Sequence, residues 1–117
     1  MNTLPKILRH IDPNRIKNLL VEAVDQYSPS FAEIPAMRVF AEALDEAGIP
    51  YYRQSVPSPL SNSNRGNLVV GLGPTDDIAL LWVGHLDTIE LWHDEGHQAR
   101  IAGDALYGLG AADMKGG

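Results

Sequence analysis

Apolar residues near the start of the chain recur at the spacing of one helix face. They fall at i, i+3, i+4, i+7, i+8 and i+11, the pattern of a helix that buries one side. These residues are Ile16, Leu19, Leu20, Ala23, Val24 and Tyr27. Asp12 can cap the first turn, and Pro13 is tolerated at the first helical position because its missing N–H has no partner there. The pattern predicts a helix that begins at Pro13.

A second apolar stripe follows after a short polar turn. It consists of Met37, Phe40, Ala41 and Leu44. Ser30 and Glu33 have the spacing of a capping box, in which each side chain bonds the other residue's backbone N–H, although Pro35 leaves the start of the helix uncertain. Gly48 is the expected stop, because glycine adopts the left-handed conformation that ends many helices.

The rest of the chain shows strand patterns. Residues 51–56 and 67–71 are short and rich in β-branched or aromatic residues, and residues 99–102 and 105–107 predict a small hairpin. The continuous apolar run Ile78–Val83 is typical of a strand buried on both faces of a parallel sheet. The predicted fold class is therefore α/β: two N-terminal helices followed by a mostly parallel sheet.

Composition narrows the classes of protein further. With 117 residues and 44% hydrophobic content, the chain can bury one modest core. A net charge of −6 without a Lys/Arg cluster argues against a nucleic-acid partner. The absence of cysteine excludes disulfides, thiolate ligands and cysteine nucleophiles. Residues 1–6 lack a secretory signal, and no apolar run is long enough to cross a membrane, so we expect a cytoplasmic protein.

Two short islands carry candidate chemistry. The first, Gly84–Thr88, directly follows the apolar run, at the strand end where α/β sheets bind ligands. His85 and Asp87 are two residues apart and point to the same side of an extended segment. His85 can bind a metal through one ring nitrogen while Asp87 accepts a hydrogen bond from the other and fixes the tautomer. Taken alone, a His-x-Asp pattern is too short to be specific, and the alternative is a strand-end His and Asp that only cap backbone groups.

The second island, Tyr107–Gly117, is rich in glycine and contains Asp113. Gly108 and Gly110 allow backbone conformations closed to other residues, and a carboxylate on such a loop can offer one oxygen to each of two metal ions. The alternative is an ordinary aspartate in a surface turn.

In this order and at this separation, the two islands closely resemble the M20 family of metallopeptidases and amidohydrolases. This family includes acetylornithine deacetylase, succinyl-diaminopimelate desuccinylase, aminoacylase and glutamate carboxypeptidase. The resemblance extends to residues 64–69, like the strand before the family's histidine strand, and to the turn Tyr27-Ser28-Pro29-Ser30.

The resemblance implies a role for three residues. His85 matches the first zinc ligand, Asp87 the acidic residue that orients it and is usually counted as catalytic, and Asp113 the carboxylate that bridges two zinc ions. It implies two Zn²⁺ ions in a complete site, with Co²⁺ or Mn²⁺ as substitutes, and a cis peptide between Asp113 and Met114. The expected reaction is hydrolysis of an N-acyl amino acid or a peptide by metal-bound water.

Other family residues have no counterpart here, namely a Glu-Glu pair that supplies the general base and a ligand, a further acidic ligand and a late histidine. We therefore expect residues 1–117 to be the N-terminal part of a metallohydrolase catalytic domain, without its lid domain and C-terminal part, and to be inactive alone. Apolar surface left exposed in such a piece predicts a homo-oligomer. Substrate identity stays open, with a deacylase favoured only by family frequency.

Alternatives remain open at this stage. His93, Glu95 and His97 form a possible but weak reserve cluster of ligands in what reads as a solvated loop. The chain can be a non-catalytic scaffold or a weak metal-binding module. A nucleotide-binding module around Gly108-Leu109-Gly110 is disfavoured, because Asp113 stands where the phosphate fingerprint needs a third glycine and would repel a pyrophosphate.

Overall fold

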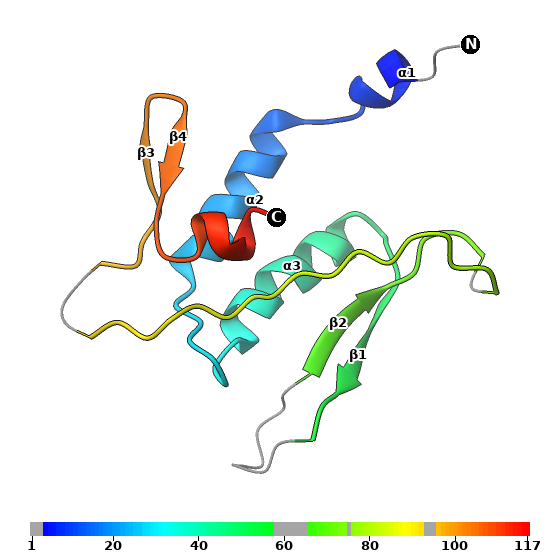
Figure 1. The fold of residues 1–117 in the computed structure, drawn as a ribbon. Helices are drawn as coiled ribbons and strands as arrows, with labels where there is room; N and C mark the ends of the chain where they lie inside the picture. Colours follow the sequence, from blue (N-terminus) through cyan, green and yellow to red (C-terminus); the bar gives the residue numbers. More distant parts are fainter. Residues whose placement is uncertain (1–3, 58–65, 75, 93–95) are drawn as a thin grey trace.

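The computed structural model describes residues 4–57, 66–74, 76–92 and 96–117 (Figure 1). Within these ranges no helix combines the length and the apolar character that a membrane span requires. The elements follow one another along the chain as α1 (Leu4–Leu8), α2 (Pro13–Asp25), α3 (Ile34–Glu46), β1 (Tyr51–Ser55), β2 (Gly66–Val70), β3 (Arg100–Ala102), β4 (Ala105–Tyr107) and a distorted turn, η1 (Ala111–Lys115).

Helix α2 begins where its sequence predicts. The carboxylate of Asp12 accepts hydrogen bonds from the backbone N–H groups of Asn14 and Arg15 at 2.9 and 3.3 Å, so the cap is confirmed. Burial is concentrated at the end of the helix, where Ala23 and Val24 are fully buried, whereas Ile16 near its start is 57% exposed. The end of α2 is therefore the part that supports the rest of the chain.

Helix α3 begins differently from the prediction. Its N-cap is Glu33 with Pro35 in the first turn, and the predicted capping box is wrong. Phe31 adopts a positive φ of 78°, which turns the chain between Ser30 and the helix. The side chain of Glu33 accepts a hydrogen bond from the N–H of Phe31 instead, at 2.8 Å. The Ser30 hydroxyl is thereby free to bond elsewhere.

The end of α3 agrees with the prediction. Gly48 has φ +64°, and its N–H donates to the carbonyl of Asp45 at 3.0 Å. The N–H of Ile49 reaches the carbonyl of Leu44 at 2.9 Å, which completes a Schellman motif. Gly48 as the stop of the helix is confirmed.

In the described part of the chain both sheets are two-stranded and antiparallel, so the prediction of a mostly parallel sheet is wrong. Strand β1 pairs with β2 from Tyr51 opposite Val70 to Ser55 opposite Gly66. Strands β3 and β4 form the predicted hairpin, with Arg100 opposite Tyr107. Each strand pairs with its neighbour in the sequence, which needs no crossover connection. The mixture of helices and strands itself agrees with the predicted α/β composition.

The run Ile78–Val83 is not a strand, contrary to the prediction. Apart from Ala79, its residues are 71–80% exposed. A strand that is apolar on both faces is stable only between neighbouring strands and under covering layers. In the described part of the chain the strands form only the pairs β1–β2 and β3–β4, and residues 78–83 join neither pair. Figure 1 shows the run as part of an extended segment that crosses α3.

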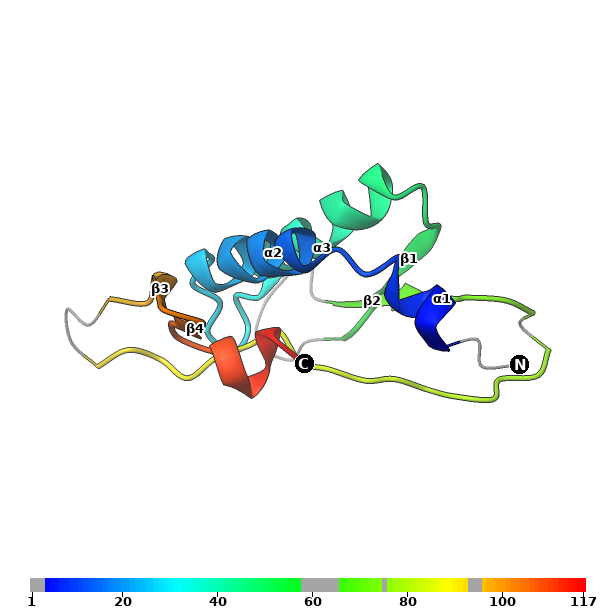
Figure 2. The ribbon, with the colours of Figure 1, turned by 90° about the horizontal axis from the view of Figure 1, so that it is seen from above.

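The buried core is small. Among the described residues it lies between α2 and α3 and consists of Ala23, Val24, Ala36, Met37 and Ala41. The accessible surface of 9273 Å² exceeds the roughly 6,200 Å² of a compact protein of this mass. Seen from above, α2 and α3 lie on one side of the molecule, and the extended segment and η1 lie on the other (Figure 2).

Candidate metal centre

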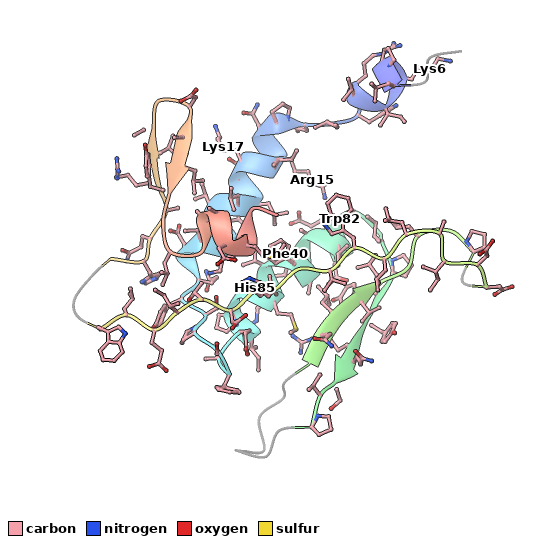
Figure 3. The ribbon with its side chains drawn as sticks, viewed as in Figure 1. Lys6, Arg15, Lys17, Phe40, Trp82 and His85 are labelled. Carbon is pink, nitrogen blue, oxygen red and sulfur yellow. The ribbon has the colours of Figure 1, made fainter. Side chains whose placement is uncertain are left out.

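His85 lies on the extended segment that follows the apolar run (Figure 3). Its Nδ1 atom is 3.2 Å from Oδ1 of Asp87 and 3.1 Å from the Asp87 carbonyl oxygen. Residues two apart on an extended chain share a side, and this spacing lets the carboxylate reach back to the ring. One nitrogen of His85 is thus held by Asp87, and the other is directed elsewhere.

That second nitrogen points to Asp113. The Nε2 atom of His85 is 3.0 Å from Oδ1 of Asp113, which lies 28 residues later in η1. Gly110, with φ +78°, precedes η1, and the peptide between Asp113 and Met114 is cis, as the resemblance implies. The side chain of Asp113 is 90% exposed, compared with 47% for His85. The structure therefore brings all three predicted site residues together at a solvent-accessible place.

The linker between α2 and α3 holds the segment that carries His85. The buried hydroxyl of Ser28 donates to the Leu86 carbonyl at 2.7 Å, and the N–H of Thr88 donates to the Ser28 carbonyl at 2.9 Å. A parallel bridge pairs Pro29 with Thr88. Alongside them, the hydroxyl of Ser30 donates to Oδ2 of Asp87 at 2.6 Å. These bonds connect residues about 57 positions apart and fix the backbone on which His85 lies.

The loop that carries Asp113 is anchored on the end of α2. The ammonium of Lys115, only 5% exposed, donates to the carbonyl of Gln26 at 2.7 Å. A Cβ at Gly108 would collide with Val24 on the same helix. A Cβ at Gly110 would lie 2.6 Å from the methyl group of Thr88. Gly108 is therefore required because the loop approaches α2 closely, and Gly110 because the loop approaches the segment that carries His85.

The charges of the three site residues affect one another. The pKa of His85 is raised, first because its ring is hydrogen-bonded to Asp113 and then because of the bond to the Asp87 backbone. The pKa of Asp87 is lowered, chiefly by the hydrogen bond from Ser30. Burial lowers the pKa of Lys115. The imidazole of His85 therefore lies between two carboxylates, an arrangement in which a divalent cation could replace a proton.

The spacing of the donors suits a metal ion. Two ligands bound to one zinc at about 2.1 Å lie about 3.0–3.5 Å apart, and the His85 nitrogen and Asp113 oxygen are 3.0 Å apart. Beside them is an open groove of about 430 Å³, wide enough for a small substrate. Within the described ranges, no group of three or more histidine or acidic side chains is placed to hold a metal. These residues therefore fit part of a metal site.

The suggested reserve cluster receives no support. His93 and Glu95 lie outside the described residues. His97 is directed to the end of α2, with Nε2 3.1 Å from the carbonyl oxygen of Asp25 and its ring centroid 5.5 Å from that of Tyr27.

Glycines 108 and 110 lead into η1, which has only five residues and non-helical angles at Asp113. The nucleotide-binding alternative therefore lacks the helix N-terminus that it needs.

Two contributors to the site were not predicted. The local pattern places Ser30 in a helix cap, and it indicates no role for Lys115. The turn at residues 27–30 belongs to the resemblance, which was the one available signal for Ser30. No local pattern indicates Lys115, because its partner Gln26 is 89 residues away.

Comparison with known proteins gives partial matches to hydrolases. The chain is 34% identical over 97 residues to a protein of Pyrococcus abyssi provisionally named LysW-lysine/LysW-ornithine hydrolase, a match that covers 83% of this chain and 25% of the relative. It is 40% identical over 72 residues to succinyl-diaminopimelate desuccinylase of Gluconobacter oxydans, covering 59% of this chain and 17% of that one. Acetylornithine deacetylase of Aliivibrio fischeri is 44% identical over 54 residues, covering 43% and 14%. No family model and no solved structure matches.

These three relatives share one class of protein, since by name they are a hydrolase, a desuccinylase and a deacetylase. The resemblance to the M20 family is thereby confirmed. The chain spans a quarter or less of the length of the relatives it matches.

Proposed function

We propose that this chain supplies part of the active site of a two-zinc amidohydrolase that cleaves an N-acyl amino acid or a peptide. In this proposal, residues 1–117 are the N-terminal part of the catalytic domain. The observation that carries it is the 3.0 Å approach of His85 Nε2 to Asp113 Oδ1, which joins residues from two distant segments. The names of the relatives, which include a deacetylase and a desuccinylase, favour an acyl group attached to an amino acid.

Each residue has a distinct task in this proposal. His85 and Asp113 would hold zinc, with Co²⁺ or Mn²⁺ as substitutes. When bound, such a metal lowers the pKa of a water molecule to about 7 and polarises the carbonyl to be attacked. Asp87 keeps the remaining proton of His85 on Nδ1, so that Nε2 presents a lone pair to the metal. The exposed groove beside Asp113 leaves room for the substrate.

The 117 residues alone should bind zinc weakly and should not hydrolyse substrate. A catalytic zinc takes three protein ligands and an open position, whereas the described part of the chain brings together one imidazole and one ligand carboxylate. A weak metal-binding module is for this reason the second candidate function for the chain by itself.

Zinc titration of the 117-residue chain tests the proposal. Calorimetry or competition with a chromogenic chelator should show saturable binding that is lost in His85→Ala and in Asp113→Asn. The matched control is His10→Ala, since His10 is an exposed histidine just after α1 and far from the site in sequence. Its zinc affinity should equal that of the unmodified chain.

Two results would contradict these expectations. Absence of zinc binding, or equal binding by His85→Ala, would refute the metal site and leave the scaffold alternative. Release of amino acid from N-acetylornithine or N-succinyl-diaminopimelate by the 117-residue chain, if abolished in His85→Ala, would show that the chain alone is active and would refute the predicted inactivity.

A further inference from the structure

Ser30 ends a continuous series of polar contacts that leads to the candidate metal position. Its hydroxyl donates to Oδ2 of Asp87 at 2.6 Å, and Oδ1 of the same carboxylate is 3.2 Å from Nδ1 of His85. On the other side of the ring, Nε2 is 3.0 Å from Asp113. A serine in the linker between two helices is thus joined, through one carboxylate, to the histidine 55 positions later.

The two carboxylates compete for the proton of His85. A neutral imidazole carries one N–H, which can face Asp87 from Nδ1 or Asp113 from Nε2. Only the first tautomer leaves Nε2 able to bind a metal. A carboxylate that can rotate gives up this N–H more easily than one whose second oxygen is already bonded, and Ser30 supplies that second bond.

Exposure makes this restraint necessary. The side chain of Asp87 is 37% exposed and that of His85 is 47% exposed, so packing alone leaves both free to move. The backbone carbonyl of Asp87 is the nearer acceptor for Nδ1, at 3.1 Å compared with 3.2 Å for the carboxylate oxygen, which limits what one hydroxyl can contribute. The contribution of Ser30 should accordingly be moderate.

We propose that Ser30 is a positioning residue of the metal site: its hydroxyl fixes the Asp87 carboxylate, which then keeps the His85 proton on Nδ1 and Nε2 free for the metal. This inference rests on the proposed function, because it assigns a role at the same site. It concerns orientation and not the chemical step.

The test compares Ser30→Ala, Ser30→Thr and the control Ser55→Ala in the 117-residue chain. Threonine keeps a hydroxyl at position 30, and Ser55 is an exposed serine on β1. Two quantities are measured: the side-chain ¹⁵N shifts of His85 by NMR in the metal-free chain, at a pH where the ring is neutral, and the zinc dissociation constant. Circular dichroism establishes that each variant is folded.

In Ser30→Ala the nitrogen chemical shifts of His85 should move toward those of a mixture of tautomers. Zinc should bind about three- to tenfold more weakly, an effect at or below the smallest losses of affinity that are typical when a group supporting a metal ligand is removed. Ser30→Thr and Ser55→Ala should retain the original shifts and affinity.

Unchanged shifts in folded Ser30→Ala would overturn the inference, as would failure of Ser30→Thr to restore them. If Ser30→Ala unfolds, the Ser30→Thr chain decides: unchanged shifts support the role of the hydroxyl, and altered shifts in a folded chain refute it. If the unmodified chain binds no zinc, the proposed function fails, while the NMR comparison still decides whether Ser30 orients His85.

Discussion

A single methyl group added at Gly110 should disturb the contact between the two segments of the candidate site. It has φ +78°, and a Cβ there would lie 2.6 Å from Cγ2 of Thr88. Placing alanine in a left-handed conformation costs roughly 1–2 kcal/mol. Thr88 is 8% exposed and is bound through its N–H to Ser28, so it cannot easily retreat, and forcing an extra methyl against it adds about 1–3 kcal/mol. Gly110→Ala should therefore lower the free energy of unfolding by about 2–5 kcal/mol.

Gly48→Ala separates the two contributions to this loss. Gly48 has a similar φ of +64°, but nothing lies within 4 Å of its would-be Cβ. Its replacement should cost only the conformational part, roughly 1–2 kcal/mol. Urea unfolding followed by circular dichroism measures both variants. A loss of ~3 kcal/mol with a slope of ~2 kcal/mol per M lowers the midpoint by ~1.5 M. Equal midpoints for the two variants would refute the argued contact between Gly110 and Thr88.

Two further predictions concern pH and the cap of α2. Because the pKa of His85 is raised above 6.5 by its hydrogen bond to Asp113, and only the deprotonated ring binds zinc, zinc affinity should fall about tenfold per pH unit below that raised pKa. Titrations between pH 5.5 and 8.5 measure this, and an affinity that is already constant at pH 6 would contradict it. Asp12→Ala should cost about 1 kcal/mol of stability through loss of the cap, yet leave zinc affinity unchanged in the folded chain. A parallel loss of zinc binding would show that the site depends on the start of α2.

Elements set by neighbouring residues could be predicted from the sequence. The start of α2 follows from Asp12 and Pro13, and the end of α3 follows from Gly48, since each signal acts within one helical turn. The start of α3 could not be predicted in this way, because the hydroxyl expected to cap it bonds Asp87, 57 residues away. The strand predicted over residues 78–83 is wrong for a related reason, because a continuous apolar run forms a strand only where partner strands exist.

The candidate site was predictable in part. The shared side of His85 and Asp87 follows from the geometry of an extended chain. The approach of Asp113 does not, because nothing in a separation of 28 residues determines a distance, and that expectation came from the resemblance alone. Ser30 and Lys115 contact the site region through bonds across the fold, which leave no periodic trace in the sequence.

Three consecutive residues at the end of α2 tie down three separate parts of the last quarter of the chain. The carboxylate of Asp25 accepts a hydrogen bond from the N–H of Ala99 at 2.8 Å. The carbonyl oxygen of Gln26 accepts one from the ammonium of Lys115. The hydroxyl of Tyr27 accepts one from the N–H of Leu91 at 3.1 Å. A synthetic peptide of residues 84–117 would contain both proposed metal ligands, His85 and Asp113, yet lack the scaffold that brings them together. Transplanting this half-site into another protein would consequently require the end of a helix as well as the two motifs.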